Sequence, residues 1–523
     1  MKRHILRTWA LWVRGLILAL FTQYAYAVTF AKTYGGTDED VARFVQQTSD
    51  GGYIMVGETY SFGAGYSDIF LIKTDAYGNI QWAKTYGGTY YDYAYSVQQT
   101  SDGGYIVAGH IGVLFGDYMD IFLVKTDANG NVIWAKTYGG ANYDYAYSVQ
   151  QTSDGGYILV GGTWSFGAGI FDFFLIKTDE NGNIQWAKTY GGTSEDYGFS
   201  VQQTSDGGYI VAGHTASFGA GNWDIFIIKT DANGSVQWAK TYGGTSDDLV
   251  RFVQQTSDGG YIMVGETYSF GAGYSDIFLI KTDAYGNIQW AKTYGGTDYD
   301  LAFSVQQTSD GGYIAAGYTR YVDIISAYYV FLVKTDANGN LSWAKTYGGG
   351  ISDGAFSVQR TSDNGYIVAG YTYSFGAGRW DVFFVKTDET GSVGSCSIVQ
   401  DVSPTVNNAL FSITFLFPSV SSPSFTVNSV SPTVTSPTFT VSELCFSSIS
   451  ESCQPVSGII TQYKGGIKVS VSGEFEVKVY NVSGGMVKSV KGTNEVKIDL
   501  SKGFYFVEVV SDRKLIREKV VVR

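Results

Sequence analysis

A run of five residues, Lys-Thr-Tyr-Gly-Gly, recurs seven times along the chain. The runs begin at Lys32, Lys84, Lys136, Lys188, Lys240, Lys292 and Lys345, which are 52 or 53 residues apart. Arg43–Thr89 is identical to Arg251–Thr297, so the units are recent copies of one another. Copies of one unit bury a core by packing against their neighbours, and a period of about 40–50 residues is typical of β-propeller blades.

Each unit contains four stretches with the composition of β-strands. In the first unit these are Ala42–Thr48, Gly52–Thr59, Asp68–Thr74 and Asn79–Tyr86, which are rich in β-branched and aromatic residues and lack a helical period. The connecting segments carry Asp, Asn and Gly, which favour tight turns. The 67 glycines exclude an all-helical bundle. We therefore predict an all-β chain in which residues 28–391 form a seven-bladed β-propeller with four-stranded blades.

The two ends of this array indicate how the ring closes. The seventh unit loses the pattern after Gly391, before a fourth strand. Val28–Tyr34 has the sequence of that fourth strand, but no unit precedes it. We expect this N-terminal strand to complete the last blade, which leaves no open edge in the ring.

One large ring occurs in each fourth strand. The residues are Phe30, Trp82, Trp134, Trp186, Trp238, Trp290 and Trp343. Such regular repetition predicts packing between neighbouring sheets rather than stacking on sugars.

The unit resembles a known bacterial repeat. Its order GGT-x-x-D, SVQQTSDGGYIVAG and D-I-F-L-x-KTDANGN-x-x-WAKTYGG is similar to the β-propeller repeat called SBBP. Its half TD-x-x-G-x-x-x-W is also similar to the quinoprotein (PQQ-type) propeller repeat. The resemblance covers Val28–Gly391 and implies a propeller fold, but no particular activity, because propellers host many unrelated functions.

Variation between the units gathers on one face of the predicted propeller. The connections from second to third strand and from one unit to the next share that face, and they vary and carry aromatic residues, as in Tyr60–Tyr66 and Ile111–Tyr118. Binding residues usually lie on loops held by a rigid scaffold. We therefore predict that this loop face carries any binding site.

One position after the second-strand glycine stands out because its residues are chemically diverse. It holds Glu58, His110, Gly162, His214, Glu266, Tyr318 and Tyr371. We predict Glu58, His110, His214, Glu266, Tyr318 and Tyr371 as ligand-binding residues. A metal site made of His and Glu, or exposed residues without a role, are the alternatives. No tight metal-binding motif is present, so we assign neither a metal ligand nor a catalytic residue.

Two series of aspartates also recur. One precedes the first strand and the other opens the third strand: Asp40, Asp92, Asp144, Asp196, Asp248, Asp300 and Asp353, then Asp68, Asp120, Asp172, Asp224, Asp276 and Asp381. They are either Ca²⁺ sites or turn carboxylates that accept backbone N–H bonds. Repetition in every blade favours turn carboxylates, so we predict no cofactor and keep Ca²⁺ as the alternative.

The N-terminal residues predict an exported protein. Met1–Ala27 combines basic residues, the apolar run Leu16–Phe21 and small residues at Ala25 and Ala27, which is the pattern of a signal peptide. An uncleaved anchor helix is the alternative, but the apolar run is shorter than the roughly 20 residues that span a bilayer. No later segment is long and apolar enough to span, so we expect no transmembrane helix in the mature chain.

Residues 392–458 contain all six prolines among many Ser, Thr and Val residues. This composition predicts a Ser/Thr/Pro-rich linker or stalk, with a small irregular β-domain as the alternative. Cys396, Cys445 and Cys453 flank it. An oxidising destination allows one disulfide among them, for which Cys445–Cys453 is our first candidate, with one thiol left over.

Residues 459–523 alternate between apolar and polar residues, which predicts a small antiparallel β-sandwich. The pieces Val477–Val490, Ile498–Val509 and Lys519–Arg523 resemble the type A C-terminal sorting domain of type IX secretion cargo. That resemblance implies secretion machinery as a partner and a secreted or outer cell-surface location. An ordinary carbohydrate-binding or immunoglobulin-like appendage is the alternative.

Composition narrows the function classes. The net charge of −13 argues against nucleic acid, because backbone phosphates need a basic surface. With three histidines and no nucleophile-elbow motif, the chain favours a binding protein over an enzyme. Our first hypothesis is a binding or adhesion module for an extracellular glycan or surface protein. An extracellular enzyme acting on polysaccharide and a structural surface-layer component are the alternatives.

Overall fold

The computed structural model describes most of the repeat array and, in shorter pieces, the C-terminal part of the chain. The described residues are 28–112, 118–321, 327–394, 396–410, 412–415, 419–421, 426–429, 433–435, 440–447, 460–463, 466–481, 486–500, 503–511 and 514–522. The predicted signal peptide, Met1–Ala27, lies outside them. The chain divides into two compact units, Met1–Ile449 and Ser450–Arg523.

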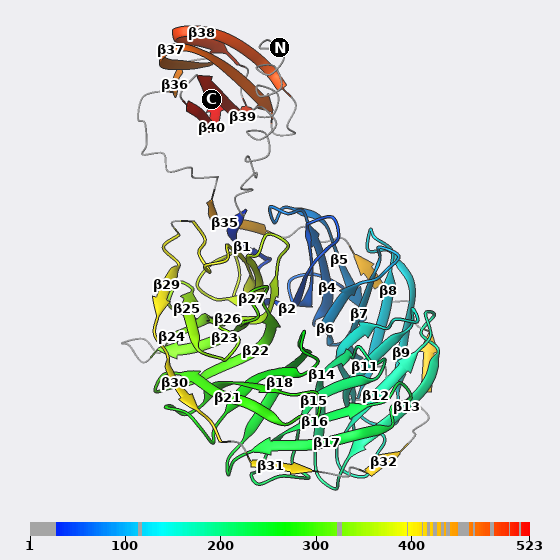
Figure 1. Ribbon diagram of the computed structural model, residues 1–523. Coiled ribbons are helices and arrows are strands. Elements are labelled where there is room, and N and C mark those ends of the chain that lie inside the picture. Colours follow the sequence, from blue (N-terminus) through cyan, green and yellow to red (C-terminus); the bar gives the residue numbers. More distant parts are fainter. Residues whose placement is uncertain are drawn as a thin grey trace, which may run out of the picture. The chain divides into compact units, whose positions relative to one another are not determined.

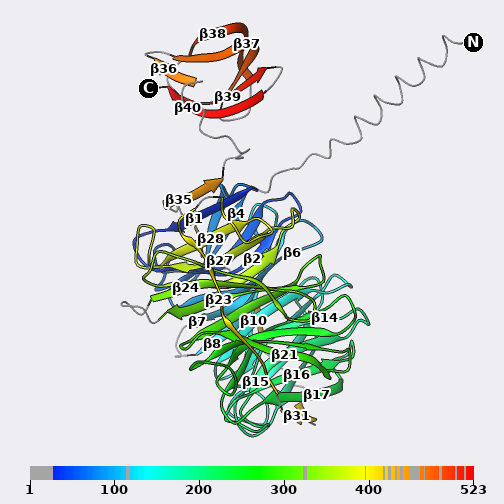
Figure 2. The ribbon, with the colours of Figure 1, turned by 60° about the vertical axis from the view of Figure 1, so that its left-hand side comes forward.

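The first unit is a seven-bladed β-propeller, as the repeat predicts (Figure 1), and Figure 2 shows it turned by 60° about the vertical axis. In blades I to VI four antiparallel strands follow one another in sequence order, and in blade VII the N-terminal strand supplies the fourth. We number the blades I to VII. The innermost, first strands of blades I to VII are β2 (Asp40–Gln47), β6 (Asp92–Gln99), β10 (Asp144–Gln151), β14 (Asp196–Gln203), β18 (Asp248–Gln255), β22 (Asp300–Gln307) and β26 (Asp353–Arg360). Each contacts the next, and β26 contacts β2, so the ring is closed.

The second and third strands of each blade are almost completely buried because they pack against sheets on both sides. The second strands are β3 (Tyr53–Thr59), β7 (Tyr105–Gly112), β11 (Tyr157–Thr163), β15 (Tyr209–Thr215), β19 (Tyr261–Thr267), β23 (Tyr313–Tyr321) and β27 (Tyr366–Thr372). The third strands are β4 (Asp68–Thr74), β8 (Met119–Thr126), β12 (Asp172–Thr178), β16 (Asp224–Thr230), β20 (Asp276–Thr282), β24 (Ala327–Thr335) and β28 (Asp381–Thr387).

The fourth strands carry the Lys-Thr-Tyr-Gly-Gly runs. They are β5 (Ile80–Gly87), β9 (Val132–Gly139), β13 (Ile184–Gly191), β17 (Val236–Gly243), β21 (Ile288–Gly295), β25 (Leu341–Tyr347) and, for blade VII, β1 (Thr29–Gly35). The four strands of blade I begin and end within two residues of the stretches predicted from the sequence, and β4 agrees at both ends.

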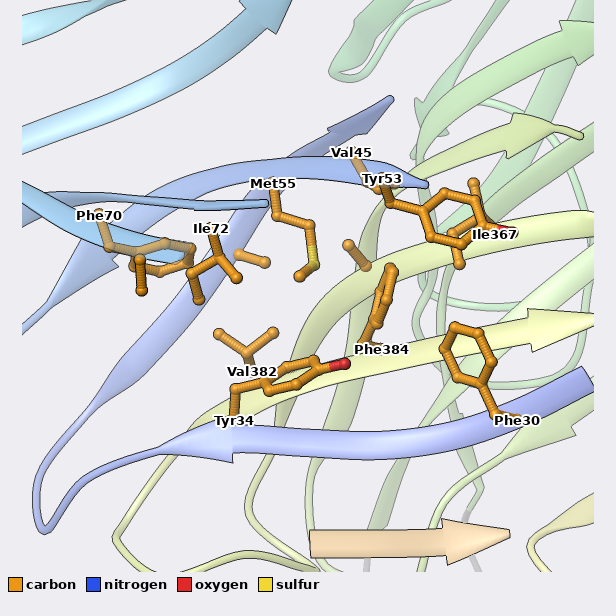
Figure 3. Close-up of a cluster of buried hydrophobic side chains, with 13 residues drawn as sticks. Phe30, Tyr34, Val45, Tyr53, Met55, Phe70, Ile72, Ile367, Val382 and Phe384 are labelled. Carbon is orange, nitrogen blue, oxygen red and sulfur yellow. The ribbon is translucent and has the colours of Figure 1, made fainter. Parts of the chain in front are cut away.

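The N-terminal strand closes the ring, which confirms the prediction. β1 pairs antiparallel with β28, with Phe30 opposite Lys386 and Tyr34 opposite Val382. Figure 3 shows Phe30 and Tyr34 pointing from β1 toward Phe384 in the closing blade. The chain's first and last propeller strands therefore share one sheet and one core.

The repeated tyrosine joins each blade to the next. Tyr34, which is buried, donates its hydroxyl to the carbonyl of Gly78 in blade I at 2.5 Å. The same bond recurs from Tyr86, Tyr138, Tyr190, Tyr242, Tyr294 and Tyr347 to Gly130, Gly182, Gly234, Gly286, Gly339 and Gly391. Burial raises the pKa of Tyr34 well above its ordinary value, so the hydroxyl stays protonated and donates. These interblade bonds explain why the run is invariant.

The fourth-strand rings also lie between blades, which confirms their packing role. The Trp82 ring lies 5.8 Å from that of Tyr105 in the next blade. Phe30 lies 6.3 Å from Tyr53 across the closing seam. The pairs Trp134–Tyr157, Trp186–Tyr209, Trp238–Tyr261, Trp290–Tyr313 and Trp343–Tyr366 repeat this contact.

The segment predicted as a stalk instead adds a fifth strand to every blade. Its strands pair in turn with the fourth strands of blades VI, V, IV, III, II, I and VII. They are β29 (Val399–Val402), β30 (Thr405–Asn408), β31 (Ser412–Phe415), β32 (Ser419–Ser421), β33 (Thr426–Ser429), β34 (Thr433–Thr435) and β35 (Thr440–Ser447). We call Val399–Ser447 the belt, because its strands lie along the rim of the ring (Figure 1). The expectation of a stalk or separate β-domain is therefore corrected over these residues.

The belt keeps one register on all seven blades. An aliphatic residue every seven positions lies opposite the repeated tyrosine: Val399, Val406, Ile413, Val420, Val427, Val434 and Val441 face Tyr347, Tyr294, Tyr242, Tyr190, Tyr138, Tyr86 and Tyr34. Seven extended residues reach about 23 Å, which is the length of belt available for each blade. Pro404 falls between β29 and β30, where no ladder N–H is lost.

The disulfide prediction was wrong. Cys396 pairs with Cys445, and their Cα atoms are 5.8 Å apart. The two cysteines are far apart in sequence, but blade VII brings them together because Cys445 lies on β35, which pairs with β1. Cys453 lies outside the described residues.

The second unit contains β36 (Ile460–Tyr463), β37 (Gly466–Asn481), β38 (Met486–Asp499), β39 (Gly503–Ser511) and β40 (Lys514–Val522). The long β37 pairs with β38 on one edge and with β36 and β39 on the other. All described strands of this unit thus belong to one antiparallel sheet, and the two-layer sandwich that we expected is not confirmed. Val469, Val477 and Ile498 form part of its buried face.

Candidate ligand-binding site

A β-bulge in every first strand directs one side chain toward the axis. In blade I the register between β2 and β3 shifts between Ala42 and Phe44, which leaves Arg43 as the extra residue. A bulge of this kind re-aims the unpaired side chain. The same shift occurs in the other six blades. The seven bulged residues, which we call the axial ring, are Arg43, Tyr95, Tyr147, Phe199, Arg251, Phe303 and Phe356.

The axial ring is continuous. The ring centroids of Tyr95 and Tyr147 are 5.3 Å apart, those of Tyr147 and Phe199 4.8 Å, and those of Phe303 and Phe356 4.9 Å. The Arg251 guanidinium carbon lies 5.4 Å from the Phe199 centroid and 5.6 Å from that of Phe303. Arg43 lies 4.4 Å from Phe356 and 5.7 Å from Tyr95. All seven side chains are half-buried.

The residues predicted from the sequence lie directly behind the axial ring. Glu58 and Glu266 are 3% and 1% exposed, and each holds a ring arginine. Glu58 Oε1 lies 2.5 Å from Arg43 Nη2, and Glu266 Oε1 lies 2.6 Å from Arg251 Nη2. Arg43 Nε donates to Glu58 as well, at 3.0 Å. The two ion pairs make this part of the ring close to neutral.

The two histidines are buried among aromatic rings. His110 lies 5.5 Å from Tyr95 and 5.4 Å from Tyr93, between ring centroids. His214 lies 4.7 Å from Phe199 and 4.8 Å from Trp223. Burial, assisted by the charge of Arg43, lowers the pKa of His110 to about 3, so its imidazole is neutral at pH 7. Burial lowers the pKa of His214 as well.

The two predicted tyrosines connect the axial ring to the loop face. Tyr318 lies 5.7 Å from Phe303 and 5.5 Å from Tyr328. Tyr371 lies 5.6 Å from Phe356 and 5.3 Å from Trp380. The six residues predicted from the sequence therefore form a layer between the axial ring and the loop face. Whether these residues contact a ligand stays a prediction.

In blade III the corresponding residue is Gly162, which has no side chain, and other aromatic residues connect the axial ring to the loop face. There Tyr147 contacts Tyr145 at 6.4 Å, Tyr145 contacts Tyr143 at 5.8 Å, and Tyr143 contacts Trp164 at 6.0 Å. We call such a chain of contacts from axial ring to loop a spoke. Blades II, III, IV, VI and VII each have one, and blades I and V have the Arg–Glu pairs instead.

Exposed aromatic side chains concentrate on the loop face. Among the described residues, Tyr60, Tyr66, Tyr90, Tyr91, Tyr118, Trp164, Tyr268, Tyr274, Tyr373 and Trp380 are exposed there, whereas only Tyr77 and Tyr285 are exposed on the opposite turns. Several stack on one another: Tyr66 on Tyr91 at 5.3 Å, and Tyr274 on Tyr299 at 5.5 Å. Stacking fixes their orientation before any ligand arrives.

The repeated aspartates hold these loops in place. Asp40 Oδ2 accepts bonds from Gly36 N at 2.8 Å and Ser61 Oγ at 2.7 Å. Asp68 Oδ2 accepts bonds from Ala64 N at 2.9 Å and Gly65 N at 3.0 Å. The prediction of turn carboxylates is confirmed for these residues. Within the described parts of the chain, no three His, Cys, Asp or Glu side chains gather as a metal site would require. Ca²⁺ binding stays an untested expectation.

Sequence reasoning missed the axial ring itself. The signal was present: the fourth residue of each first strand is always planar, either aromatic or arginine. It also missed the seven-residue period of the belt, which becomes visible only when the aliphatic residues are aligned with the blades.

Comparison with known proteins identifies the C-terminal unit. Residues 462–523 match the family described as the secretion system C-terminal sorting domain. The chain is thus a β-propeller protein that carries a type IX secretion sorting tail, and it is secreted or held at the outer cell surface. No helix among the described residues is long and apolar enough to cross a membrane.

Similarities of the remaining chain are weaker. A stretch of 171 residues is 25% identical to the regulatory protein FlaEY of Caulobacter vibrioides, which covers 28% of this chain and 18% of that protein. Among solved structures, Sqt1 from Chaetomium thermophilum aligns with 69% of this chain and all of its own, with 10% identity and a TM-score of 0.39. The resemblance to the SBBP repeat stays as the sequence suggested it.

Proposed function

We propose that this protein is an exported binding or adhesion module that holds an extracellular glycan or surface protein on the loop face of its propeller. The observation that supports the proposal is the concentration of exposed, mutually stacked aromatic side chains on one face. Aromatic rings offer large contact areas at little cost in conformational entropy, which is why they are enriched where proteins bind partners.

The scaffold suits such a role. The loops are tied down by buried aspartates, the blades are joined by interblade hydrogen bonds, and the belt covers the rim. Rigid loops lose little freedom on binding, so more of the contact energy appears as affinity. The sorting tail delivers this face to the cell exterior, where glycans and surface proteins are the available partners.

The test is a binding screen with the full chain. We expect saturable binding to at least one immobilised polysaccharide or glycan-bearing surface, and a loss of at least tenfold in affinity for Trp164→Ala or Tyr274→Ala. Tyr285→Ala removes an equally exposed ring from the opposite turns and should leave affinity unchanged. Binding that survives both loop-face changes contradicts the proposal.

Two alternatives have their own signatures in the same experiment. Release of new reducing ends from a polysaccharide would support an extracellular enzyme instead. Absence of both binding and turnover, with the protein abundant at the surface, would support a structural surface-layer component.

A further inference from the structure

We propose that the axial ring is a subsite for one neutral sugar residue of an extracellular glycan. This inference rests on the proposed binding function and names the ligand class and a place for it. The residues involved are the seven bulged side chains, together with Glu58 and Glu266 behind them.

The construction of the axial ring is the first argument. All seven blades interrupt their inner ladder at the same residue, and a bulge costs regular pairing at each place. The side chains presented there are planar without exception, although the residue varies between Arg, Tyr and Phe. A packing role alone would accept branched aliphatic residues, which dominate the neighbouring strands. Planar groups are what stacks against the C–H faces of a sugar ring.

The charges of the axial ring point to a neutral ligand. Each arginine is matched by a nearly fully buried glutamate, so an anionic sugar meets no net positive charge. The propeller is also acidic, within a chain of net charge −13. Glu58 engages only Nε and Nη2 of Arg43, and Glu266 engages the same atoms of Arg251. Nη1 of each arginine is therefore available to donate to sugar hydroxyls, which accept hydrogen bonds readily.

The spokes connect this subsite to the loop face. In blade II the contacts run from Tyr95 through His110, Tyr93 and Tyr91 to the exposed Tyr66. In blade III they run from Tyr147 to Trp164. The spokes thus pack the axial ring against the exposed rings of the loop face, and in blade III every member is half-buried or exposed rather than buried. A few polar groups at the axis would fix the orientation of a bound sugar.

The experiment measures binding of defined oligosaccharides to the full chain by calorimetry. Neutral probes are cellohexaose, xylohexaose and mannohexaose, and the acidic probe is hexagalacturonate. Tyr147→Ala removes a planar face from the ring without touching an ion pair, and Tyr147→Phe restores that face. Trp164→Ala alters the exposed end of the same spoke. Tyr285→Ala is the matched control, and near-ultraviolet circular dichroism checks the fold of each variant.

We expect a neutral probe to bind, with a loss of at least tenfold in affinity for Tyr147→Ala, recovery in Tyr147→Phe, and no change in Tyr285→Ala. Wild-type affinity in Tyr147→Ala together with a loss in Trp164→Ala would overturn the axial subsite but leave the proposed function standing. Preference for hexagalacturonate would overturn the neutral ligand class. If no probe and no glycan surface binds, the axial subsite and the glycan form of the proposed function both fail.

Discussion

Cys396 and Cys445 are joined by a disulfide although the chain between them passes all seven blades of the propeller. The bond turns the belt into a covalently closed hoop around the rim. The belt strands pair with the outer edges of the blades, which are otherwise open to pairing with another chain. The hoop therefore covers the outer edge of all seven four-stranded sheets, and its two ends stay joined unless the disulfide is reduced.

Breaking the hoop should destabilise the propeller. Cys445→Ser frees a loop with a sequence separation of 49 residues, for which chain entropy alone predicts a loss of about 4 kcal/mol. We expect a lower urea midpoint and faster proteolysis within the belt. Cys453→Ser is the control and should behave as wild type. Equal protease resistance of Cys445→Ser and wild type would show that the hoop does not hold the belt.

The seven-residue spacing of the belt should be strict. Deleting Ser422 shortens the spacing from Val420 to Val427 from seven positions to six, so the register is lost on one side of the deletion. A one-residue slip also places each aliphatic belt residue opposite a residue other than the repeated tyrosine. We expect release of part of the belt, detected by limited proteolysis, whereas Ser422→Ala should leave the cleavage pattern unchanged. A deletion variant as resistant as wild type contradicts the register.

The Arg251–Glu266 ion pair in blade V should contribute more to the free energy of unfolding than ion pairs on the surface do. Arg251→Met leaves the buried carboxylate of Glu266 without its partner, which should cost about 3 kcal/mol. The double change Arg251→Met/Glu266→Leu should cost less, because no uncompensated charge remains. Arg379→Met breaks an exposed pair with Glu39 and should cost less than about 1 kcal/mol. Equal losses in the single and double variants, measured by urea unfolding, would refute the argument.

The buried aspartates should contribute more to the stability of the propeller at pH 5 than at pH 8. Burial raises the pKa of Asp92 to about 7, and it raises the pKa of Asp40 to about 6 despite hydrogen bonds that oppose the shift. A carboxyl group whose pKa is higher in the folded state than in the unfolded state stabilises the fold when it is protonated. This stabilisation is complete below the group's ordinary pKa and is lost as pH rises through about 6 to 7. Burial alone would raise the pKa of Asp50, but hydrogen bonds from Thr48 and Lys73 lower it to about 2. The stabilisation that the ionised Asp50 gives to the folded state is therefore lost only below the pH range of this test.

Urea midpoints at pH 5, 6.5 and 8 test this expectation. Asp92→Asn removes one titrating group, so it should reduce the fall in unfolding free energy between pH 5 and pH 8. Glu389→Gln removes the same charge at an exposed position and should keep the wild-type slope. A slope in Asp92→Asn as steep as in wild type would count against a raised pKa at Asp92.

Most of the architecture could be predicted because the contacts within a blade join residues that are close in sequence. Its four strands and tight turns lie within one unit of 52 residues, so Asp, Asn and Gly at the turns and the alternation between them define it. The closing strand was predictable from what was missing: blade VII lacked a fourth strand, and the sequence of Phe30–Tyr34 had no blade. The sorting tail was predictable from short motifs near the C-terminus.

The candidate site was only partly predictable. Loop variation pointed to the face on which the exposed aromatic side chains concentrate. The structure places Glu58 and His110 behind the axial ring, and whether they contact a ligand stays a prediction. A one-residue bulge decides which side chain faces the axis, and composition does not reveal where the ladder shifts.

The sequence by itself determined the repeating blade, the count of seven, the closure by the N-terminal strand and the exported location. Only the tertiary structure decided the axial ring, the belt and the Cys396–Cys445 pairing. The reason is the range of the contacts: Val434 lies opposite Tyr86, although about two thirds of the chain separates the two residues. The seven-residue spacing of aliphatic residues can be interpreted only when the closed ring is known, because the ring presents seven equivalent sheet edges with which the belt pairs in turn.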